Sequence, residues 1–411
     1  MVAPGRSQGT LGSSPVAVGL VLCVLMWFSV VGQSLVGVLG PIFVNDLGLS
    51  RQRLGTLTMV AFGVGAITSF RSEKVRLTDG RVATSIAQCF LAVGIGVMAL
   101  APNAFWLTVA VAIIGGAGGF GNPIANVVIR KRLNGKGQIT ATALKQSGVQ
   151  LGGFLNGIGI PALAVAIGWR WALGVWAAIP LLGALVSRVV LSGGTHVDTG
   201  AGYTVADGVP RSAENLLWPL AIYGFLMGAA TSIVLAYLPL YVHERFDVVT
   251  EQAGWTVAAI GLLGAVVRIV GPHGLARLGV STGRALILVA IGTALSTVFL
   301  AMSNGLGLGL VWAGVVVYGF TGATWNVFMH LAILERAAPS ELSRLTGRTQ
   351  LGFYSGLAAT PTFFGWIVDR TGQYATAWPV TVLFAVGAVA VGIWAAREYA
   401  RGREMSPLER T

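Results

Sequence analysis

Long apolar stretches are the feature that most restricts the fold of this chain. Crossing a bilayer as a helix takes about 20 predominantly apolar residues, and buried strands extend over only about 4–8 residues. The stretches therefore predict membrane-spanning α-helices. There are twelve: Ala17–Val38, Leu54–Phe70, Ala83–Ala101, Phe105–Ile129, Ala141–Ile167, Trp171–Leu191, Leu216–Val242, Ala253–Val270, Ala285–Met302, Leu306–Leu334, Thr349–Val368 and Ala377–Ala396.

The composition excludes most other classes of protein. Only 10% of the 411 residues are charged, whereas a soluble chain carries roughly 25%. This composition argues against a disordered chain, a nucleic-acid-binding protein and almost any soluble enzyme. The net charge of +12 therefore needs an explanation other than nucleic acid.

The positions of Lys and Arg predict the orientation in the membrane. If both termini are cytoplasmic, twenty of the 27 Lys and Arg residues fall in inner segments and five in outer ones. Cytoplasmic loops carry the excess of positive charge, so this distribution predicts cytoplasmic N- and C-termini in a multi-pass protein of the plasma membrane. Lys145 and Arg268 belong to neither set, because both lie inside predicted spans.

The two halves of the chain resemble each other. Residues 192–215 are rich in Gly, Ser, Thr and Asp, which predicts a cytoplasmic linker between six-helix bundles at 1–191 and 216–411. Gly119-Phe120 and Asn126-Val127 recur 200 residues later, as do Gln150-Leu151-Gly152 and Pro161. Parallel repeats of six helices are typical of transporters, in which two bundles rock about a site between them.

The chain resembles the major facilitator superfamily over nearly its whole length. The resemblance is carried by the six-plus-six arrangement, the basic loop Arg71–Arg81 and the segment Gly168–Trp171. It implies alternating access, with Asp79, Gly80 and Arg81 forming a conformational loop that ties inner helix ends together. Ordinary turn chemistry is the alternative for that loop. The stretch Lys145–Gly152 resembles bacterial organic-anion and cyanate-type members, and an eighth-span Arg resembles the anion-binding Arg of related carriers.

Ionisable groups inside bilayer spans are costly, and they are functional hypotheses by default. All 15 acidic residues fall in loops or at span ends, so Lys145 and Arg268 lack an obvious acidic partner in the sequence. Helical spacing places polar side chains on shared faces near them. The candidate substrate-binding residues are Gln33, Asn122, Asn126, Lys145, Gln146, Asn156, Arg268, Asn326, His330 and Arg348.

Other interpretations of these residues stay open. Lys145 and Arg268 could extend to the cytoplasmic interface, and the Asn residues could join helices by hydrogen bonds. The glycines of the fourth and tenth spans favour close helix packing. His330 could be hydrated or could couple transport to protons.

The sequence predicts a secondary transporter that moves a small solute, and a small anion is the favoured class of solute. The alternative is an efflux transporter for hydrophobic compounds, although exporter motifs of the fourth and fifth spans are missing. The scattered His residues, the lack of a phosphate-binding loop and the lack of a metal motif predict no enzyme activity, no cofactor and no metal. We expect a monomer whose partners are its substrate and the lipid bilayer.

Overall fold

The computed structural model describes residues 14–72, 79–192, 211–336 and 342–404, and all regular elements of these segments are α-helices. The helices are α1 (Pro15–Ser29), α2 (Val31–Val38), α3 (Gly40–Leu47), α4 (Arg51–Ser72), α5 (Gly80–Ala99), α6 (Ala104–Gly119), α7 (Gly121–Arg132), α8 (Gly135–Ile167), α9 (Trp169–Val190), α10 (Arg211–Phe246), α11 (Thr250–Arg277), α12 (Thr282–Leu306), α13 (Leu308–Phe320), α14 (Trp325–Arg336), α15 (Leu342–Thr371) and α16 (Tyr374–Glu404).

Ten helices among the described residues are long and apolar enough to cross a membrane. The number of spans rises to eleven if the bent pair α1 and α2, whose axes differ by 51°, is counted as one span. The predicted eleventh span lies in α15, which is not among them, so the prediction of twelve spans is only partly supported. Polar residues such as Arg348 and Gln350 lie in α15, and this helix packs against α10 and α4.

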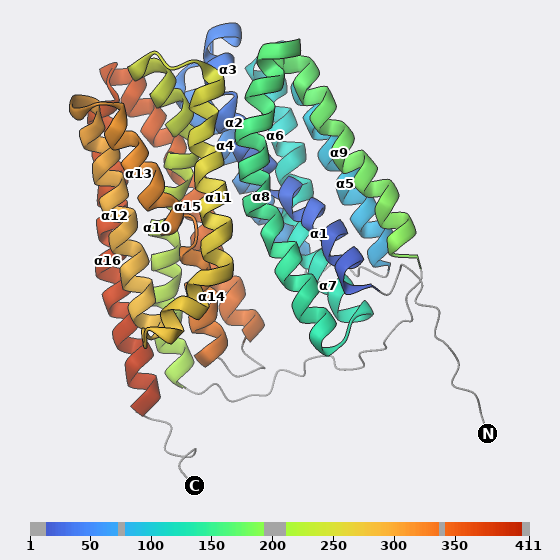
Figure 1. The fold of residues 1–411 in the computed structure, drawn as a ribbon, viewed down its shortest axis with the longest axis vertical. Coiled ribbons are helices and arrows are strands. Elements are labelled where there is room, and N and C mark those ends of the chain that lie inside the picture. Colours follow the sequence, from blue (N-terminus) through green and yellow to red (C-terminus); the bar gives the residue numbers. More distant parts are fainter. Residues whose placement is uncertain (1–13, 73–78, 193–210, 337–341, 405–411) are drawn as a thin grey trace.

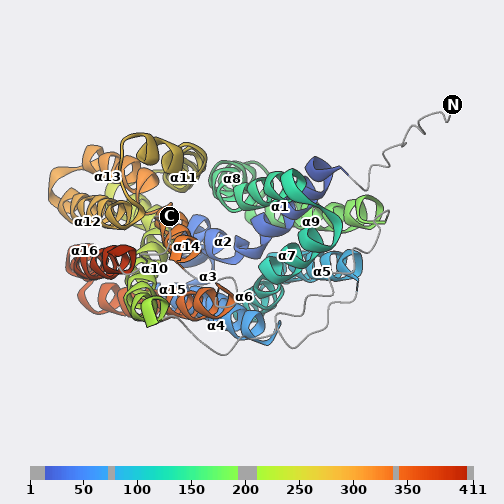
Figure 2. The same ribbon diagram turned by 90° about the horizontal axis from the view of Figure 1, so that it is seen from below.

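The helices form two groups that lie side by side (Figures 1 and 2). Helices α1–α9 make up one group and α10–α16 the other, and the start of α1 and the end of α16 lie at the same end of the molecule. The groups contact each other chiefly through α4 with α15, α8 with α11, and α2 with α10. Most of the predicted linker lies outside the described residues, and α10 begins within its last residues.

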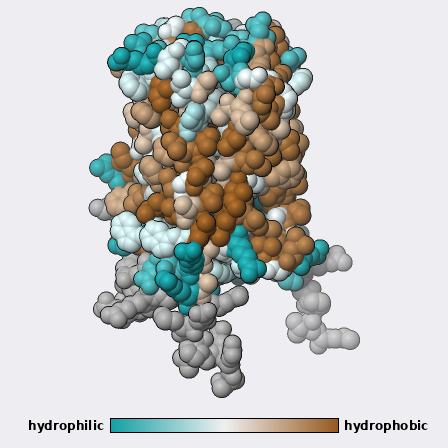
Figure 3. Space-filling model, turned by 90° about the vertical axis from the view of Figure 1, so that its left-hand side faces the viewer, coloured by the Kyte–Doolittle hydropathy of each residue, from teal (hydrophilic) through white to brown (hydrophobic). Residues whose placement is uncertain are grey.

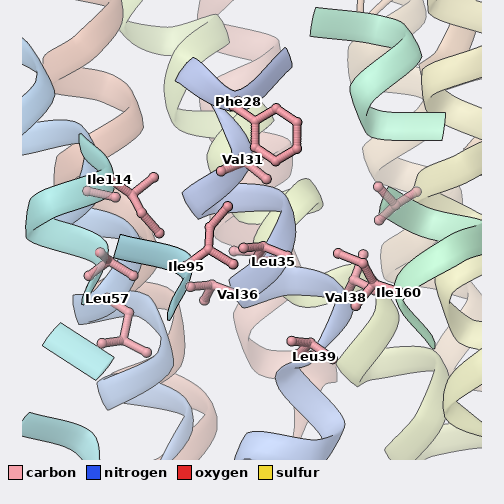
Figure 4. Close-up of a cluster of buried hydrophobic side chains, with 14 of the residues drawn as sticks. Phe28, Val31, Leu35, Val36, Val38, Leu39, Leu57, Ile95, Ile114 and Ile160 are labelled. Atoms are coloured by element: carbon pink, nitrogen blue, oxygen red, sulfur yellow. The ribbon is translucent and has the colours of Figure 1, made fainter. Parts of the chain in front are cut away.

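The core surrounds the short helix α2, which contacts α10 and α11 of the other group. Leu35, Val36 and Val38 are fully buried there, and Ile95 and Ile160 approach from other helices (Figure 4). On the face that Figure 3 shows, a band of apolar side chains lies between two hydrophilic ends. Large apolar side chains of α12 and α16 such as Leu288 and Leu383 are exposed, which suits a lipid-facing surface.

Glycines allow helices to approach closely at the break between α6 and α7. A Cβ at Gly118 would collide with the carbonyl oxygen of Ser29, and one at Gly119 with that of Gly65. Small residues let transmembrane helices pack backbone to backbone. The predicted packing role of the fourth-span glycines is confirmed by these contacts.

Candidate functional site between the two helix groups

Lys145 is a buried cation held by one neutral partner. Its side chain lies in α8 and is only 2% exposed. Its Nζ donates to Oδ1 of Asn126 in α7 at 2.6 Å. The ammonium group therefore lies against the second half of the predicted fourth span. It does not extend freely to the membrane interface.

Arg268 repeats this arrangement in the other helix group. Its Nη2 donates to Oδ1 of Asn326 at 3.0 Å, which joins α11 to α14. Its Nε is buried without a hydrogen-bond partner among the described residues. Arg268 thus has donor capacity that the described protein atoms leave unused.

The two asparagines occupy corresponding places in the repeats. Asn126 lies in α7, just after the break between α6 and α7, and Asn326 lies in α14, just after a break at residues 321–324. Broken transmembrane helices are typical of transporter binding sites, because irregular backbone is tolerated where it lines a cavity.

His330 lies one turn after Asn326 in α14. Its Nδ1 donates to the backbone carbonyl oxygen of Asn326 at 2.6 Å, since a carbonyl can only accept. The imidazole lies near the side chain of Gln350, and the charges of Arg268 and Lys145 act on it. Residues from both helix groups therefore converge on one place.

Two glutamines belong to this place although the predicted site did not include them. Gln150 of α8 donates from Nε2 to the carbonyl oxygen of Ala323 at 2.9 Å, and so joins one helix group to the break in the other. The side chain of Gln350 lies close to those of His330 and Tyr354. Their recurrence at an interval of 200 residues is the sequence signal that could have identified them.

Other predicted residues lie in different surroundings. Gln146 and Arg348 are exposed, Asn122 is half-buried, and Gln33 is 7% exposed with its Nε2 unpartnered among the described residues. Within the described segments, the hydrogen bonds of Lys145 and Arg268 go to Asn126 and Asn326 and to none of these four.

Three hydrogen bonds hold the side chain of Asn156. Its Oδ1 accepts from the indole Nε1 of Trp27 at 3.0 Å and of Trp176 at 2.8 Å, and its Nδ2 donates to Ser34 at 2.7 Å. All four residues lie in α1–α9. The geometry favours the interpretation of Asn156 as a link between helices.

The predicted conformational loop begins α5. Asp79 is the N-cap residue, its carboxylate accepts from the backbone N–H of Arg81 at 2.8 Å, and Nη2 of Arg81 lies 3.5 Å from it. Desolvation raises the pKa of Asp79, but the backbone hydrogen bonds from Arg81 and Val82 and the charges of Arg81 and Arg132 outweigh it, so the pKa is below its ordinary value. Residues 73–78 of the loop lie outside the described residues.

Polar contacts join the helix groups at the end opposite the start of α1. Oδ1 and Oδ2 of Asp369 accept from the backbone N–H groups of Arg51 and Gln52 at 3.0 and 2.8 Å. The Arg51 guanidinium forms an ion pair with Glu244 at 2.7 Å. The hydroxyl of Tyr237 donates to the carbonyl oxygens of Arg51 and Pro361, and its oxygen lies 2.7 Å from each of them.

These contacts define which end of the interface is closed. The ring pair Phe62–Tyr354 and the hydrogen bond of Gln150 also join the two groups. Beyond them, toward the end with the start of α1, Asn126 and Gln146 are exposed. The cations thus lie between these contacts and the open end of the interface, which is the end with the start of α1.

The described residues offer no cluster of three or more His, Cys, Asp and Glu that could hold a metal ion. The side chains that converge here donate hydrogen bonds, and they are either positively charged groups or neutral amides. Such a set suits reversible binding of an anion.

Comparison with known proteins identifies the fold and the family. The model of the Major Facilitator Superfamily matches residues 22–336. Among curated proteins, none matches this chain significantly.

Solved transporter structures are similar to this chain over nearly its full length. A bacterial homologue of the human lysosomal transporter Spinster, in an inward-facing and unoccupied conformation, is 14% identical with a TM-score of 0.75, covering 97% of this chain and 99% of that chain. A POT family transporter in complex with 5-aminolevulinic acid is 15% identical with a TM-score of 0.75, covering 92% and 94%. The nucleoside transporter NupG, as a D323A mutant, is 14% identical with a TM-score of 0.72, covering 92% and 99%.

At these identities the structures show the fold, and the family model shows the membership. The efflux alternative gains no support from them. The chain belongs to the Major Facilitator Superfamily and is a multi-pass integral membrane transporter of a small-molecule substrate.

Proposed function

We propose that this transporter moves a small anion by alternating access, and that the anion binds between Lys145 and Arg268. The observation that carries the proposal is the pair of inward-pointing cations, each bonded only to an asparagine oxygen among the described residues. A neutral amide oxygen attracts a cation less than a carboxylate does. An anionic substrate would therefore gain more at this site than a neutral one.

The roles of the side chains follow from their geometry. Arg268 offers a planar fork that suits a carboxylate or a similar anion, and Lys145 acts as a point charge. Asn126 and Asn326 hold the cations in place, and His330 and Gln350 add polar contacts at the same level. Gln33, Asn122, Gln146 and Arg348 stay candidates for the wider cavity.

The proposal includes the conformational cycle. With both termini in the cytoplasm, the open end is the inner one and the molecule faces inward. The contacts of Arg51 and Asp369 then close the outer end, and Asp79, Gly80 and Arg81 are the loop that re-forms contacts when the inner end closes. The similarity to an inward-facing Spinster homologue supports this assignment of state.

We further propose twelve spans arranged as two pseudo-symmetric six-helix bundles at 1–191 and 216–411, in a monomer of the plasma membrane. The corresponding asparagines and helix breaks of the two halves support the repeat. The polar character of α15 is compatible with a span that is covered by other helices, because it packs against α10 and α4.

The test is ligand-induced thermal stabilisation of the purified protein in detergent. A ligand that binds only the folded state raises the melting temperature by mass action. The panel contains small carboxylates, cyanate, sulfate, sugars, amino acids and bulky apolar drugs, and each hit is repeated on Lys145→Gln and Arg268→Gln.

The matched controls are Lys136→Gln and Arg277→Gln, which remove exposed cations from the same two helices. Stabilisation by an anion that survives in the controls and is lost in the site variants supports the proposal. Stabilisation by bulky apolar compounds alone refutes it and favours efflux.

A further inference from the structure

The cation site has more hydrogen-bond donors than the described protein acceptors use. An ammonium group has three donors, of which Lys145 uses one on Asn126. A guanidinium has five, and Arg268 uses Nη2 on Asn326 while its Nε is buried without a described partner. A ligand with several acceptor atoms can therefore use donors that the described protein atoms leave unused.

The two positive charges come from opposite sides of the interface. Lys145 belongs to α8 and Arg268 to α11, which pack against each other across the two helix groups. Gly153 and Gln150 of α8 lie against Gly261 and Gly264 of α11, and this antiparallel register brings Lys145 and Arg268 to the same level. One ligand bound at this level can thus be near both cations.

A ligand with one negative charge would neutralise only one of them. The other cation would remain in a poorly hydrated place with an amide oxygen as its partner, which is unfavourable. On the basis of the proposed anion site, we propose that the substrate is a small dianion with two acidic ends, one bound by Arg268 and the other by Lys145.

The charges of the described residues also disfavour a zwitterion. A substrate with an ammonium group needs a carboxylate to receive it. The acidic residues whose surroundings the structure describes lie at or near helix ends or in turns: Asp46, Asp79, Glu244, Asp247, Glu251, Glu335, Asp369 and Glu398. An amino acid would therefore bring its ammonium group to a site that already contains two cations.

A dianion that reaches both cations would also link the two helix groups. Each asparagine is bonded to a cation of its own group, so the asparagines provide no link across the interface. Binding at both ends would then favour approach of α8 and α11 on the open side, because a ligand stabilises the conformer that it contacts better.

The experiment compares succinate with succinamate, which has nearly the same shape and one charge instead of two. Oxalate, malonate and glutarate extend the series in length, and acetate and butyrate are additional monoanions. Apparent dissociation constants are measured at pH 7 by thermal shift and by calorimetry on wild type, Lys145→Gln, Lys145→Arg and Arg268→Gln.

At least one dianion should bind wild type about tenfold or more tightly than its monoamide or monoanion counterpart, since close charge pairs contribute strongly when desolvated. In Lys145→Gln this ratio should fall to near one, and in Lys145→Arg it should be retained. A structural role of Lys145 would alter stability but would leave the ratio unchanged.

Equal affinity for dianions and their monoanion counterparts in wild type refutes the proposal of a dianionic substrate. The proposal of an anion transporter is not affected by that result. A ratio that survives in both Lys145→Gln and Arg268→Gln also refutes it. Binding of no member of the series, mono- or dianionic, overturns the dianion together with an organic-anion substrate.

Discussion

Asp369, in the last turn of α15, caps the N-terminus of α4 in the other helix group. Its two oxygens accept the N–H groups of Arg51 and Gln52 at 3.0 and 2.8 Å, and Ser50 Oγ accepts that of Arg53 at 3.3 Å. An acid is unfavourable at the C-terminus of its own helix but favourable at the N-terminus of another. The location of Asp369 is therefore explained by its partner across the interface.

Replacing Asp369 should shift the protein toward the state that is open at this end. Loss of a helix cap costs about 1 kcal/mol, which corresponds to a roughly fivefold change in the ratio of conformers for Asp369→Ala. Asp369→Asn should cause a smaller shift, because its amide oxygen still accepts one hydrogen bond.

The measurement is the rate of labelling of a cysteine at Ala258, which is buried against Gly157 of the other group, after Cys23 and Cys89 are replaced. The rate should rise in the Asp369 variants. Asp247→Asn is the control, since it removes an exposed acid of the same end at a left-handed position that Asn tolerates. Unchanged labelling in Asp369→Ala would show that the cap does not hold this end closed.

The ion pair of Arg51 and Glu244 should matter less than the cap. Its side chains are 35% and 19% exposed, and partly exposed pairs contribute about 0–1 kcal/mol. Glu244→Gln should raise the labelling rate of the Ala258 cysteine by less than Asp369→Ala, and the increase should shrink as salt is added. Because Tyr374 also donates to Glu244 at 2.6 Å, Tyr374→Phe is a useful companion that removes the hydroxyl alone. A larger effect for Glu244→Gln than for Asp369→Ala would reverse this order.

Sequence patterns could predict helices but not their breaks. The second span was predicted as Leu54–Phe70 and the helix is Arg51–Ser72, because apolarity ends where the helix leaves the bilayer while helical hydrogen bonding continues. The first, fourth and tenth spans are interrupted at Val30, at Phe120 and at residues 321–324. These breaks lie inside the predicted spans, whose hydropathy contains no sign of them.

Sequence patterns also could not predict which side chains from distant helices contact each other. The sequence could identify Lys145 and Arg268 as unusual cations, because charge inside an apolar span stands out. It could not show that Asn126 and Asn326 receive them, nor that Asp369 reaches α4. Those contacts depend on how helices far apart in the chain pack together.

Asn156 should be important for stability rather than for substrate binding. Asn156→Ala leaves the indole N–H groups of Trp27 and Trp176 and the hydroxyl of Ser34 without their partner. Interhelical hydrogen bonds in membrane proteins contribute about 0.6 kcal/mol on average and up to about 1.7, so loss of three should cost about 1–3 kcal/mol. The melting temperature should fall, while the affinity for the identified anion changes less than twofold. An affinity loss of tenfold or more in folded protein would instead assign Asn156 to the binding site.

A carboxylate placed beside either cation should compete with the substrate. Asn126→Asp puts a negative charge where Lys145 Nζ now has an amide oxygen at 2.6 Å, and Asn326→Asp does the same for Arg268. Each variant should fold at least as stably as wild type, because a charged hydrogen bond replaces a neutral one. Anion affinity should nevertheless fall about tenfold or more in each, since the new ion pair must be broken before the anion binds. The control is Asn103→Asp, which retains the N-cap of α6 far from the cations. Unimpaired anion binding in both site variants, measured by the same thermal shift, would show that neither cation meets the substrate.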